Sequence, residues 1–346
     1  MSVDLATLAV RKKLSLSELS GRKVAIDAYN VLYQFLTIIR GPDGTPLTDK
    51  NGNVTSHLSG LFYRTIELIE NGIRPVYVFD GVPSKLKQKT IEARMSRRDE
   101  ALSAWEQAKK EGNLEEARKY AQQSTRMSKY VVDTSKQLLD FMGVPYVKAP
   151  GEGEAEASYM CKSGLVYAAA SQDYDTLLFG SPVVVRNLTI SGRRKLPKKN
   201  IFVNIEPEII FLDETLNALG LDQRKLIWVG ILLGTDFNDG IRGIGPKTAL
   251  KIVKEATSLS EVEEYVKQKY KAEFSSDVNE VESLFLKPEV TLEGLESIVN
   301  GMDTPADKTA LLDFMCKEHD FSEDRVTKFI EKLSARKAAG KQHRLF

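Results

Sequence analysis

Three short apolar segments, each ending at or beside a carboxylate, constrain the fold of this chain more than any other feature. They are residues 23–27, 75–80 and 165–171. Runs of aliphatic and aromatic residues without polar alternation are typical of strands in a sheet that is covered on both faces. Helical patterns at residues 56–72 and 133–143 separate the three segments. The sequence therefore predicts an α/β fold with a mostly parallel sheet flanked by helices.

Acidic residues lie where these strands end and where helices begin. The candidates are Asp27, Asp80, Glu152, Glu154, Asp173, Asp175 and Asp236. Any one of them, taken alone, is explained well enough by a helix cap, a turn or a solvated charge, since acids in a first helical turn are stabilised by the helix dipole. Because the carboxyl ends of parallel strands meet at one edge of a sheet, we expect at least three of these chain-distant acids to lie together.

A cluster of carboxylates favours a divalent metal site. Clustered carboxylates repel one another unless cations intervene. A ligand set made only of oxygen selects Mg²⁺, or Mn²⁺ in its place, and none of the histidines (His57, His319 and His343) lies near these acids in the sequence. Two such ions roughly 3.5–4 Å apart stabilise both the attacking and the leaving oxygen of an in-line phosphoryl displacement. We therefore expect a phosphodiesterase with two Mg²⁺ ions per active site.

Between residues 81 and 130 the composition changes and charged residues replace the large apolar ones. A break at residues 111–113 predicts two charged helices joined by a turn and inserted between strands. The start of the segment is densely basic, and a helix that reaches back far enough places Lys87, Arg94 and Arg98 on one face. This pattern fits an ordinary solvated helix as well as an electrostatic funnel for a single nucleic-acid strand.

A glycine-rich stretch precedes a predicted helix that starts at Pro246. Gly243 and Gly245 leave backbone N–H groups free at the positive end of that helix, and Lys247 and Lys251 lie on one of its faces. This is a sequence-independent phosphate cradle, although a simple glycine-rich connector is the alternative. A nucleotide-binding P-loop is excluded because Pro246 interrupts the Gly-Lys pair that such a loop requires.

A second basic patch, on a predicted hairpin, includes Arg193 and Arg194. It matters because the formal net charge of the whole chain is only +1. If the seven acids are gathered around metal, the remaining surface is basic enough to bind nucleic acid.

The sequence also indicates the compartment. Cys161 and Cys316 show no CxxC spacing, which argues against a zinc site or disulfide framework and fits a reducing environment. The first twenty residues do not have the pattern of a secretory signal, and the longest apolar run, residues 226–234, is far short of the roughly 20 residues that span a membrane. We expect a soluble, intracellular protein without membrane contact.

Taken together, these motifs resemble the flap endonuclease family, the archaeal and eukaryotic branch of the structure-specific 5′-nucleases. The N-terminal matches are AIDA at 25–28, YQFL at 33–36, TSHLSGLFYR at 55–64 and VYVFDG at 76–81. The later matches are EGEAE at 152–156, ASQDYD at 170–175, GTDFNDGIRGIG at 234–245, FMC at 314–316 and DFSEDR at 320–325. The resemblance covers nearly the whole chain.

The resemblance implies a PIN-like core at residues 1–235 with a helical arch inserted at about 81–130. It also implies a helix–hairpin–helix element at 236–262 that grips duplex DNA with a bound K⁺, a C-terminal helical region at 263–337 and a tail at 338–346. By the same likeness, one metal ion is held by Asp27, Asp80, Glu152 and Glu154, and the other by Glu154, Asp173, Asp175 and Asp236, partly through water.

The remaining implications concern the substrate. Lys87 and Arg94 match arch residues that steer the scissile phosphate, and Tyr33 matches an aromatic residue that stacks on the terminal base. The implied activity is removal of 5′ flaps from branched DNA during Okazaki-fragment maturation and long-patch base excision repair, with 5′–3′ exonuclease and gap cleavage as side reactions. A monomer is expected.

Two positions depart from the family pattern. Ser2 replaces the glycine that usually follows the initiator methionine, which puts a role of the amino terminus near the metals in doubt. In the tail, Gln342 and Leu345 have the spacing of a motif that binds the sliding clamp (PCNA), but the chain ends at Phe346 before the aromatic pair is complete. The lack of a Lys/Arg-rich nuclear tail favours an archaeal cytoplasm, with a nuclear location as the alternative for a eukaryotic source.

Two other functions compete with this interpretation. One is a related nuclease, either RNA-directed or junction-resolving, against which the moderate length of the arch segment argues. The other is a non-catalytic DNA-binding scaffold in which the acids are structural.

Overall fold

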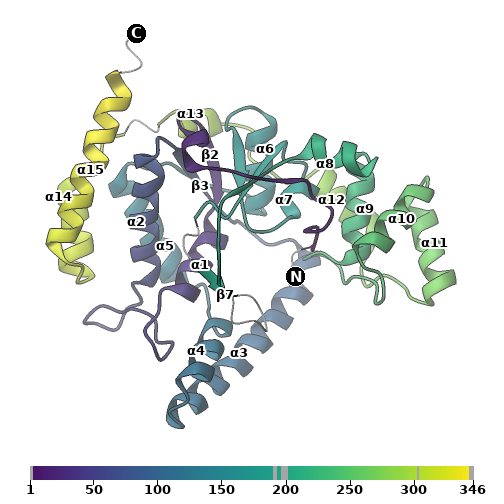
Figure 1. Ribbon diagram of the computed structural model, residues 1–346, viewed down its shortest axis with the longest axis horizontal. Helices are drawn as coiled ribbons and strands as arrows, with labels where there is room; N and C mark the ends of the chain where they lie inside the picture. The colour runs from purple at the N-terminus through teal and green to yellow at the C-terminus, as the bar shows by residue number, and fades with distance from the viewer. Residues whose placement is uncertain (1–2, 190–192, 196–201, 302–303, 343–346) are drawn as a thin grey trace.

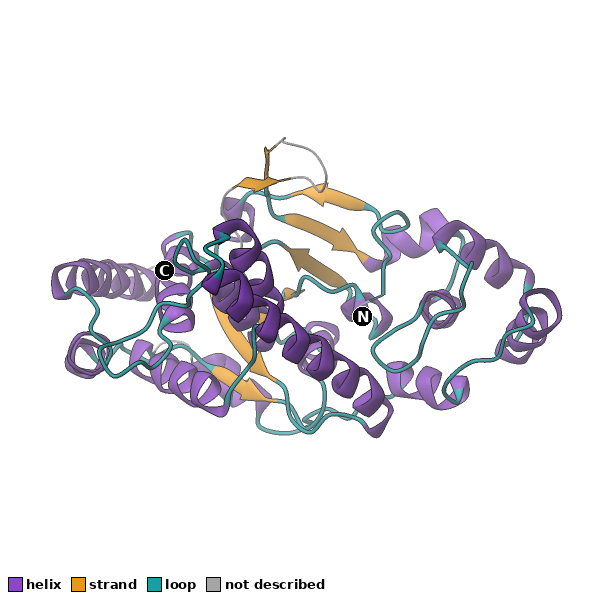
Figure 2. Ribbon diagram, turned by 90° about the horizontal axis from the view of Figure 1, so that it is seen from below, coloured by secondary structure: helices purple, strands orange, loops and turns teal. Residues whose placement is uncertain are grey.

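A seven-stranded sheet forms the centre of the computed structural model, which describes residues 3–189, 193–195, 202–301 and 304–342 (Figures 1 and 2). Its strands, in spatial order, are β1 (Arg11–Lys13), β9 (Glu208–Phe211), β6 (Val183–Arg186), β5 (Ala168–Ala170), β2 (Lys23–Asp27), β3 (Arg74–Phe79) and β4 (Tyr146–Lys148). The five strands from β6 to β4 are parallel, whereas β9 and β1 run antiparallel to their neighbours. The expected mostly parallel sheet is therefore confirmed.

The order of the parallel strands creates a switch point beside β2. The chain moves outward from β2 through β3 to β4, and then returns to β5 on the other side of β2. The connections therefore diverge at the carboxyl ends of β2 and β5, which leaves a crevice there. Ligands of open α/β sheets bind in this kind of crevice.

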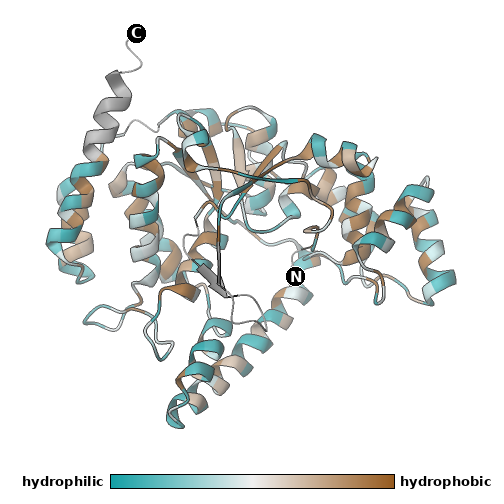
Figure 3. Cartoon of the chain, in the orientation of Figure 1, coloured by the Kyte–Doolittle hydropathy of each residue, from teal (hydrophilic) through white to brown (hydrophobic). Residues whose placement is uncertain are grey.

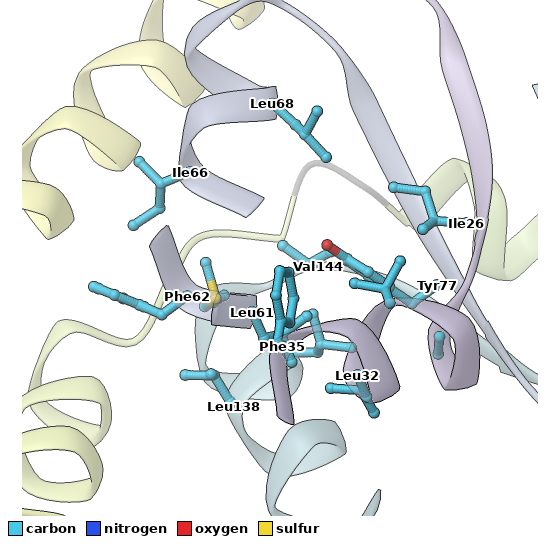
Figure 4. Close-up of a cluster of buried hydrophobic side chains, with 14 of the residues drawn as sticks. Ile26, Leu32, Phe35, Leu61, Phe62, Ile66, Leu68, Tyr77, Leu138 and Val144 are labelled. Atoms are coloured by element: carbon cyan, nitrogen blue, oxygen red, sulfur yellow. The ribbon is translucent and has the colours of Figure 1, made fainter. Parts of the chain in front are cut away.

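Helices cover both faces of the sheet, which explains why its central strands are apolar throughout. Val24 and Ile26 point to one face, where they pack against α1 (Ala28–Ile38), α2 (Ser56–Glu70) and α5 (Lys129–Met142). Figure 4 shows part of this core, including Phe35, Leu61, Phe62 and Leu138. Ala25 points to the opposite face, against α6 (Gly153–Lys162). The alternation of neighbouring side chains between two apolar layers is what a doubly covered strand requires.

A second apolar core includes Val184 of β6 and Ile210 of β9 and also takes in the N-terminal residues Val3, Leu5 and Leu8. Its helices are α7 (Asp175–Leu178), α8 (Leu212–Leu219), α9 (Gln223–Leu233), α10 (Pro246–Glu255), α11 (Leu259–Tyr270) and α12 (Val278–Leu286). Toward the C-terminus follow α13 (Leu295–Asn300), α14 (Lys308–Leu312), the π-helical turn η4 (Asp313–Glu318) and α15 (Glu323–Gln342), which packs against α2 (Figure 1).

The inserted segment forms two helices that project from the body of the protein. A short 3₁₀ turn, η2 (Lys85–Lys87), leads into α3 (Gln88–Lys110), and α4 (Leu114–Gln123) runs back alongside it (Figure 1). The buried residues of the two helices are alanines, and most of their remaining surface is hydrophilic (Figure 3). The prediction of two charged helices is confirmed. We call η2 together with this pair, residues 85–123, the arch.

Several boundaries and elements differ from the prediction. The third predicted strand spans only Ala168–Ala170, and four further strands, β1, β4, β6 and β9, were not predicted. A separate antiparallel pair, β7 (Arg193–Lys195) and β8 (Phe202–Asn204), agrees with the predicted hairpin, and η1 (Leu16–Leu19) is a 3₁₀ turn. Helix α15 continues to Gln342, a few residues past the end near residue 337 that the sequence indicates for the last helix. The residues concerned include alanine, lysine and glutamine, which favour helix.

Candidate active site

A pocket of about 800 Å³ opens at the carboxyl ends of the parallel strands. Its wall carries six of the seven candidate acids together with cations of the arch. The acids are Asp27, Asp80, Glu152, Glu154, Asp173 and Asp236, and the cations are Lys87, Arg94, Arg97 and Arg98. The seventh acid, Asp175, is buried beside them, within electrostatic reach of Glu154, Asp173 and Asp236. All seven therefore meet at the switch point of the sheet.

Two of the acids are placed by the ends of neighbouring strands. Asp27 ends β2 and caps α1, because its side chain accepts a hydrogen bond from the backbone N–H of Asn30 at 3.0 Å. Asp80 follows β3, and its Oδ1 accepts from the backbone N–H of Gly153, at the start of α6, at 2.7 Å. A Cβ at Gly153 would lie 2.6 Å from that same oxygen. The glycine is thus needed for the close approach of α6 to Asp80.

Helix α6 contributes the next pair of acids. Glu152 is its N-cap residue and Glu154 lies in its first turn. Oε1 of Glu154 accepts a hydrogen bond from the hydroxyl of Ser171, which follows β5, at 2.6 Å. This bond ties the start of α6 to the end of β5, across the crevice between the strands.

The segment after β5 supplies the last two strand-end acids. Asp173 Oδ2 accepts a hydrogen bond from Asn30 Nδ2 at 3.2 Å. Asp175 begins α7 and is 3% exposed, and its Oδ1 accepts from the backbone N–H of Val3 at 3.1 Å. The N-terminal segment therefore lies directly against the acid cluster. Ser2 itself is outside the described residues.

Asp236 comes from the loop after α9 and meets the base of the arch. Its carboxylate lies 2.5 Å from a guanidinium nitrogen of Arg94 and 3.3 Å from Lys87 Nζ. Lys87 Nζ also contacts Glu152 Oε2 at 2.5 Å. Lys87, Arg94 and Arg98 all line the pocket, although the helix does not reach back to Lys87, which ends the 3₁₀ turn η2 before α3 begins.

Burial and mutual repulsion oppose ionisation of several of these acids. Burial, with the neighbouring Asp80, raises the pKa of Asp27 well above its ordinary value. The pKa of Asp80 is raised to about 6 by burial and by Glu152, and that of Asp175 to about 8 by burial and by Asp173. The pKa of Glu154 is likewise raised by burial and the surrounding aspartates. The carboxyl groups of the cluster therefore have too little positive charge around them to offset their burial and mutual repulsion.

Lys87 and Arg94 of the arch supply positive charge on the side of the pocket where Asp236 lies. Burial of Asp236 is outweighed by Lys87 and Arg94, which together lower its pKa. Burial of Lys87 is in turn outweighed by Glu152 and Asp236, so its pKa is raised. Asp27, Glu154 and Asp175 lie deeper, where these cations compensate them less.

The donor set fits a hard divalent cation. It consists of carboxylate oxygens alone, and an added cation would relieve the repulsion that raises their pKa values. In the described part of the chain, no three carboxylate, imidazole or thiol groups already form a coordination set. The pocket thus gathers the acids without closing them around one point, while Lys87 and Arg94 pair with two of them.

An aromatic residue and several polar groups complete the pocket. Tyr33 lies on its wall, and the guanidinium carbon of Arg98 lies 5.4 Å from the centre of the Tyr33 ring. Asn30, Ser171 and Gly153, which orient the acids, were not singled out from the sequence. Of the three, only the backbone N–H of Asn30 carried a usable signal, because it follows the capping Asp27 by three residues, the spacing at which a cap meets a backbone N–H. The bond from the Asn30 side chain to Asp173 has no such local signal.

The predicted phosphate cradle lies outside this pocket, at the start of α10. Gly245 is the N-cap residue of α10 and Pro246 its first residue, while Gly243 has a positive φ of 89°. Lys247 and Lys251 are exposed. The expected helix start is confirmed, and its role in binding phosphate stays a prediction.

The other candidate residues belong to other elements or lie outside the described part. Arg193 and Arg194 belong to β7, and Gln342 is the last residue of α15. Leu345 and Phe346 lie outside the described residues. In the described ranges, no helix is both long and apolar enough to cross a lipid bilayer.

Comparison with known proteins gives matches over the whole chain. Two family models match, the XPG N-terminal domain over residues 4–101 and the XPG I-region over residues 143–236. The chain is 49% identical over 346 residues to flap endonuclease 1 of Pyrococcus furiosus, covering 100% of this chain and 98% of that one. It is 50% identical over 338 residues to flap endonuclease 1 of Saccharolobus solfataricus, covering 96% and 95%.

A solved structure agrees with these sequence matches. Flap endonuclease-1 from Methanococcus jannaschii superposes with a TM-score of 0.74 at 40% identity, covering 98% of this chain and 99% of that one. The two matched family regions together contain all seven acids of the pocket. The chain therefore belongs to the flap endonuclease family.

Proposed function

We propose that this protein is a Mg²⁺-dependent, structure-specific nuclease that hydrolyses a DNA phosphodiester near the junction of single and double strands. It removes 5′ flaps, and 5′–3′ exonuclease cleavage is a side activity. The observation that supports the proposal is the convergence of seven carboxylates in one pocket that faces the cations of the arch. The family relatives are flap endonucleases by name, which supports the choice of substrate.

Two groups of acids would hold two Mg²⁺ ions, for which Mn²⁺ can substitute. The first group is Asp27, Asp80, Glu152 and Glu154, and the second is Glu154, Asp173, Asp175 and Asp236. When bound, these ions supply the positive charge that stabilises the attacking and leaving oxygens of an in-line displacement.

The arch cations and Tyr33 position the substrate in this proposal. Lys87 and Arg94 hold acid oxygens in the pocket, and a phosphate that enters the same space brings anionic oxygens that they bind equally well. Tyr33 offers an aromatic face at the pocket wall. Stacking there offsets part of the few kcal/mol that unpairing the terminal nucleotide costs.

Duplex DNA is bound by a second element in this proposal. The start of α10 presents backbone N–H groups and the exposed Lys247 and Lys251 to phosphates, with K⁺ bound in the loop before the helix. Arg193 and Arg194 add a further basic contact. In this proposal the chain has three parts: a PIN-like core at residues 1–235, a helix–hairpin–helix element at 236–262 and C-terminal helices at 263–337.

In the cell, we place this activity in Okazaki-fragment maturation and long-patch base excision repair. The relatives from archaea favour an archaeal cytoplasm. We also propose that the protein acts as a monomer. The tail residues Gln342, Leu345 and Phe346 provide a partial site for the sliding clamp.

The proposal is tested with a panel of flap, nick, hairpin, bubble, junction and single-stranded DNA and RNA substrates, each with Mg²⁺ and with EDTA. The 5′-flap DNA is expected to be cut fastest, and EDTA to abolish cleavage. Asp175→Asn is expected to slow flap cleavage at least about a hundredfold. Asp213→Asn, at an exposed acid in the first turn of α8, is the matched control and keeps the wild-type rate.

Three results would contradict the proposal. Unchanged cleavage by Asp175→Asn would show that the pocket acids do not take part in the reaction. A preference for RNA, or for junctions over flaps, would assign the pocket to a related nuclease. Binding of branched DNA without any cleavage would indicate a scaffold.

A further inference from the structure

The loop that follows α9 carries a second carboxylate toward the arch. Asp236 points into the pocket, and three residues later Asp239 lies on the outside, where its Oδ2 is 3.1 Å from Lys89 Nζ. Lys89 comes two residues after Lys87, at the base of the same arch. One loop therefore contacts the arch base on both its inner and its outer side.

Internal hydrogen bonds hold residues 234–240 in one conformation. The buried side chain of Asn238 bonds to the hydroxyl of Thr235, and its amide donates to the carbonyl oxygen of Ile231 at 2.8 Å. Gly234 has a φ of 94°, and a Cβ at Gly240 would lie 2.2 Å from the carbonyl oxygen of Leu233. These contacts hold Asp236 and Asp239 in one short, tightly packed loop.

Neighbouring elements fix this loop from the other side. The hydroxyl of Ser275 accepts a hydrogen bond from the backbone N–H of Asp239 at 3.0 Å, and the hydroxyl of Ser276 donates to the carbonyl oxygen of Phe237 at 3.0 Å. Phe237 is 2% exposed. The loop also runs on into Gly243, Gly245 and α10, the proposed duplex-binding element.

We propose that Asp239 is a positioning residue for the arch. Its ion pair with Lys89 holds the start of α3 in the register that brings Lys87 and Arg94 over the acid pocket. Asp239 acts through these two cations and does not itself reach the pocket wall. This inference rests on the proposed function, since it assigns a role to the arch in that same reaction.

Because the Lys89–Asp239 ion pair is exposed, its effect on the cleavage rate can be measured without a change in global stability. The side chains of Lys89 and Asp239 are 77% and 69% exposed, and exposed ion pairs contribute little to global stability. Removing the pair therefore leaves the fold intact, while the start of α3 loses an anchor. The loss should appear in the rate of chemistry and in the local mobility of α3, and not in the melting temperature.

The test compares Asp239→Asn, Asp239→Lys and the exchange of charges in Lys89→Asp with Asp239→Lys. Single-turnover flap cleavage with Mg²⁺ is expected to slow about threefold to fivefold in the first and on the order of tenfold in the second. The exchange restores the rate to within about twofold of the wild type. In the metal-free protein, Asp239→Lys speeds hydrogen exchange in the first two turns of α3 and leaves α10 unchanged.

A second surface ion pair provides the control. Lys267 and Glu273 lie 3.0 Å apart with side chains 71% and 77% exposed, and they contact no part of the pocket. Glu273→Lys is expected to change neither the cleavage rate nor the exchange of α3.

Each remaining outcome is decisive. The inference is overturned if Asp239→Lys leaves both the cleavage rate and the hydrogen exchange of α3 at their wild-type values. It is also overturned if the double variant with swapped charges does not recover the wild-type cleavage rate, or if Glu273→Lys slows cleavage as much as Asp239→Lys does. Failure of the wild-type protein to cut any flap with Mg²⁺ would instead reject the proposed function, because the exchange measurement on α3 needs no catalysis.

Discussion

Gly153 is the residue on which the position of Asp80 depends most directly. Its backbone N–H binds Asp80 Oδ1, and a Cβ at this position would lie 2.6 Å from the same oxygen. Gly151, two residues earlier, has no such neighbour, since the nearest atom to a Cβ there is the carbonyl oxygen of Glu289 at 3.7 Å. The structure therefore has room for an alanine side chain at Gly151 but not at Gly153.

Gly153→Ala is expected to push Asp80 away from α6 and so to slow flap cleavage by about tenfold to a hundredfold, because small displacements of reacting groups are costly. Single-turnover cleavage at saturating Mg²⁺ measures the effect. Gly151→Ala is the matched control and should cleave at the wild-type rate. Equal rates for both variants would show that Asp80 does not depend on the contact with α6.

The acids of the pocket could be predicted from the sequence, but the groups that orient them could not. Asp27, Asp80 and Asp175 stand next to recognisable strands, and strand direction alone brings them together. The bond between Asn30 and Asp173 spans 143 residues, and the bond between Val3 and Asp175 spans 172. Nothing local in the sequence marks such partners, because their pairing is decided by which strands become neighbours.

At the scale of elements, the strands show what local pattern can reveal. β2 and β3 are five and six residues long and buried on both faces, and both were predicted. β1 is three exposed basic residues, and β4 also has only three. Such segments become strands because a neighbour offers backbone hydrogen bonds, which is a tertiary effect that propensity does not contain. The arch was predicted because its charge pattern extends over some forty residues.

Helix α10 is the element on which we expect affinity for duplex DNA to depend. Lys247→Ala combined with Lys251→Ala removes two exposed cations from its first turns. Duplex affinity is expected to fall, and the slope of log affinity against log salt to decrease by about two, one for each phosphate contact. Titrations at several salt concentrations measure both quantities.

The control for this experiment is the double change Lys328→Ala with Lys332→Ala, at the same spacing on α15. It should leave the salt slope unaltered. An unchanged slope for the α10 variant as well would reject the phosphate cradle, as would an altered Mg²⁺ requirement for cleavage at saturating DNA.

At the scale of the whole molecule, the buried carboxylates of the pocket repel one another, and this repulsion makes the stability of the protein depend on pH. The pKa values of Asp80 and Asp175 are raised to about 6 and about 8, whereas those of Asp43 and Asp49 are lowered to about 2 by hydrogen bonds that outweigh any burial. A carboxyl group with a raised pKa holds its proton more tightly in the folded state. Its contribution to stability is therefore present at low pH and is lost as the pH rises through the raised value.

We therefore expect the metal-free protein to lose thermal stability between about pH 6.5 and pH 8, as the pH rises toward the raised pKa of Asp175. This window lies above the titration of Asp43 and Asp49, and above that of His57, whose pKa burial lowers to about 3 and whose contribution to stability rises with pH only up to about 6.5. Its Tm in EDTA should fall by several degrees over this range. The double variant Asp80→Asn with Asp175→Asn should show a flatter profile, and saturating Mg²⁺ should raise the Tm of the wild type more at about pH 8 than at about pH 6.5. A Tm that is constant or rises with pH over this window in EDTA would contradict this prediction.

The bond between Val3 and Asp175 has a consequence for how the protein is made. The backbone N–H of Val3 cannot bind the carboxylate of Asp175 until that residue, 172 positions later, has been synthesised, and Asp236 follows 61 positions after that. An unfinished polypeptide that stops before residue 236 therefore lacks part of the acid set, whatever it has already folded. Synthesis in chain order thus keeps the acid pocket incomplete until Asp236 has been added.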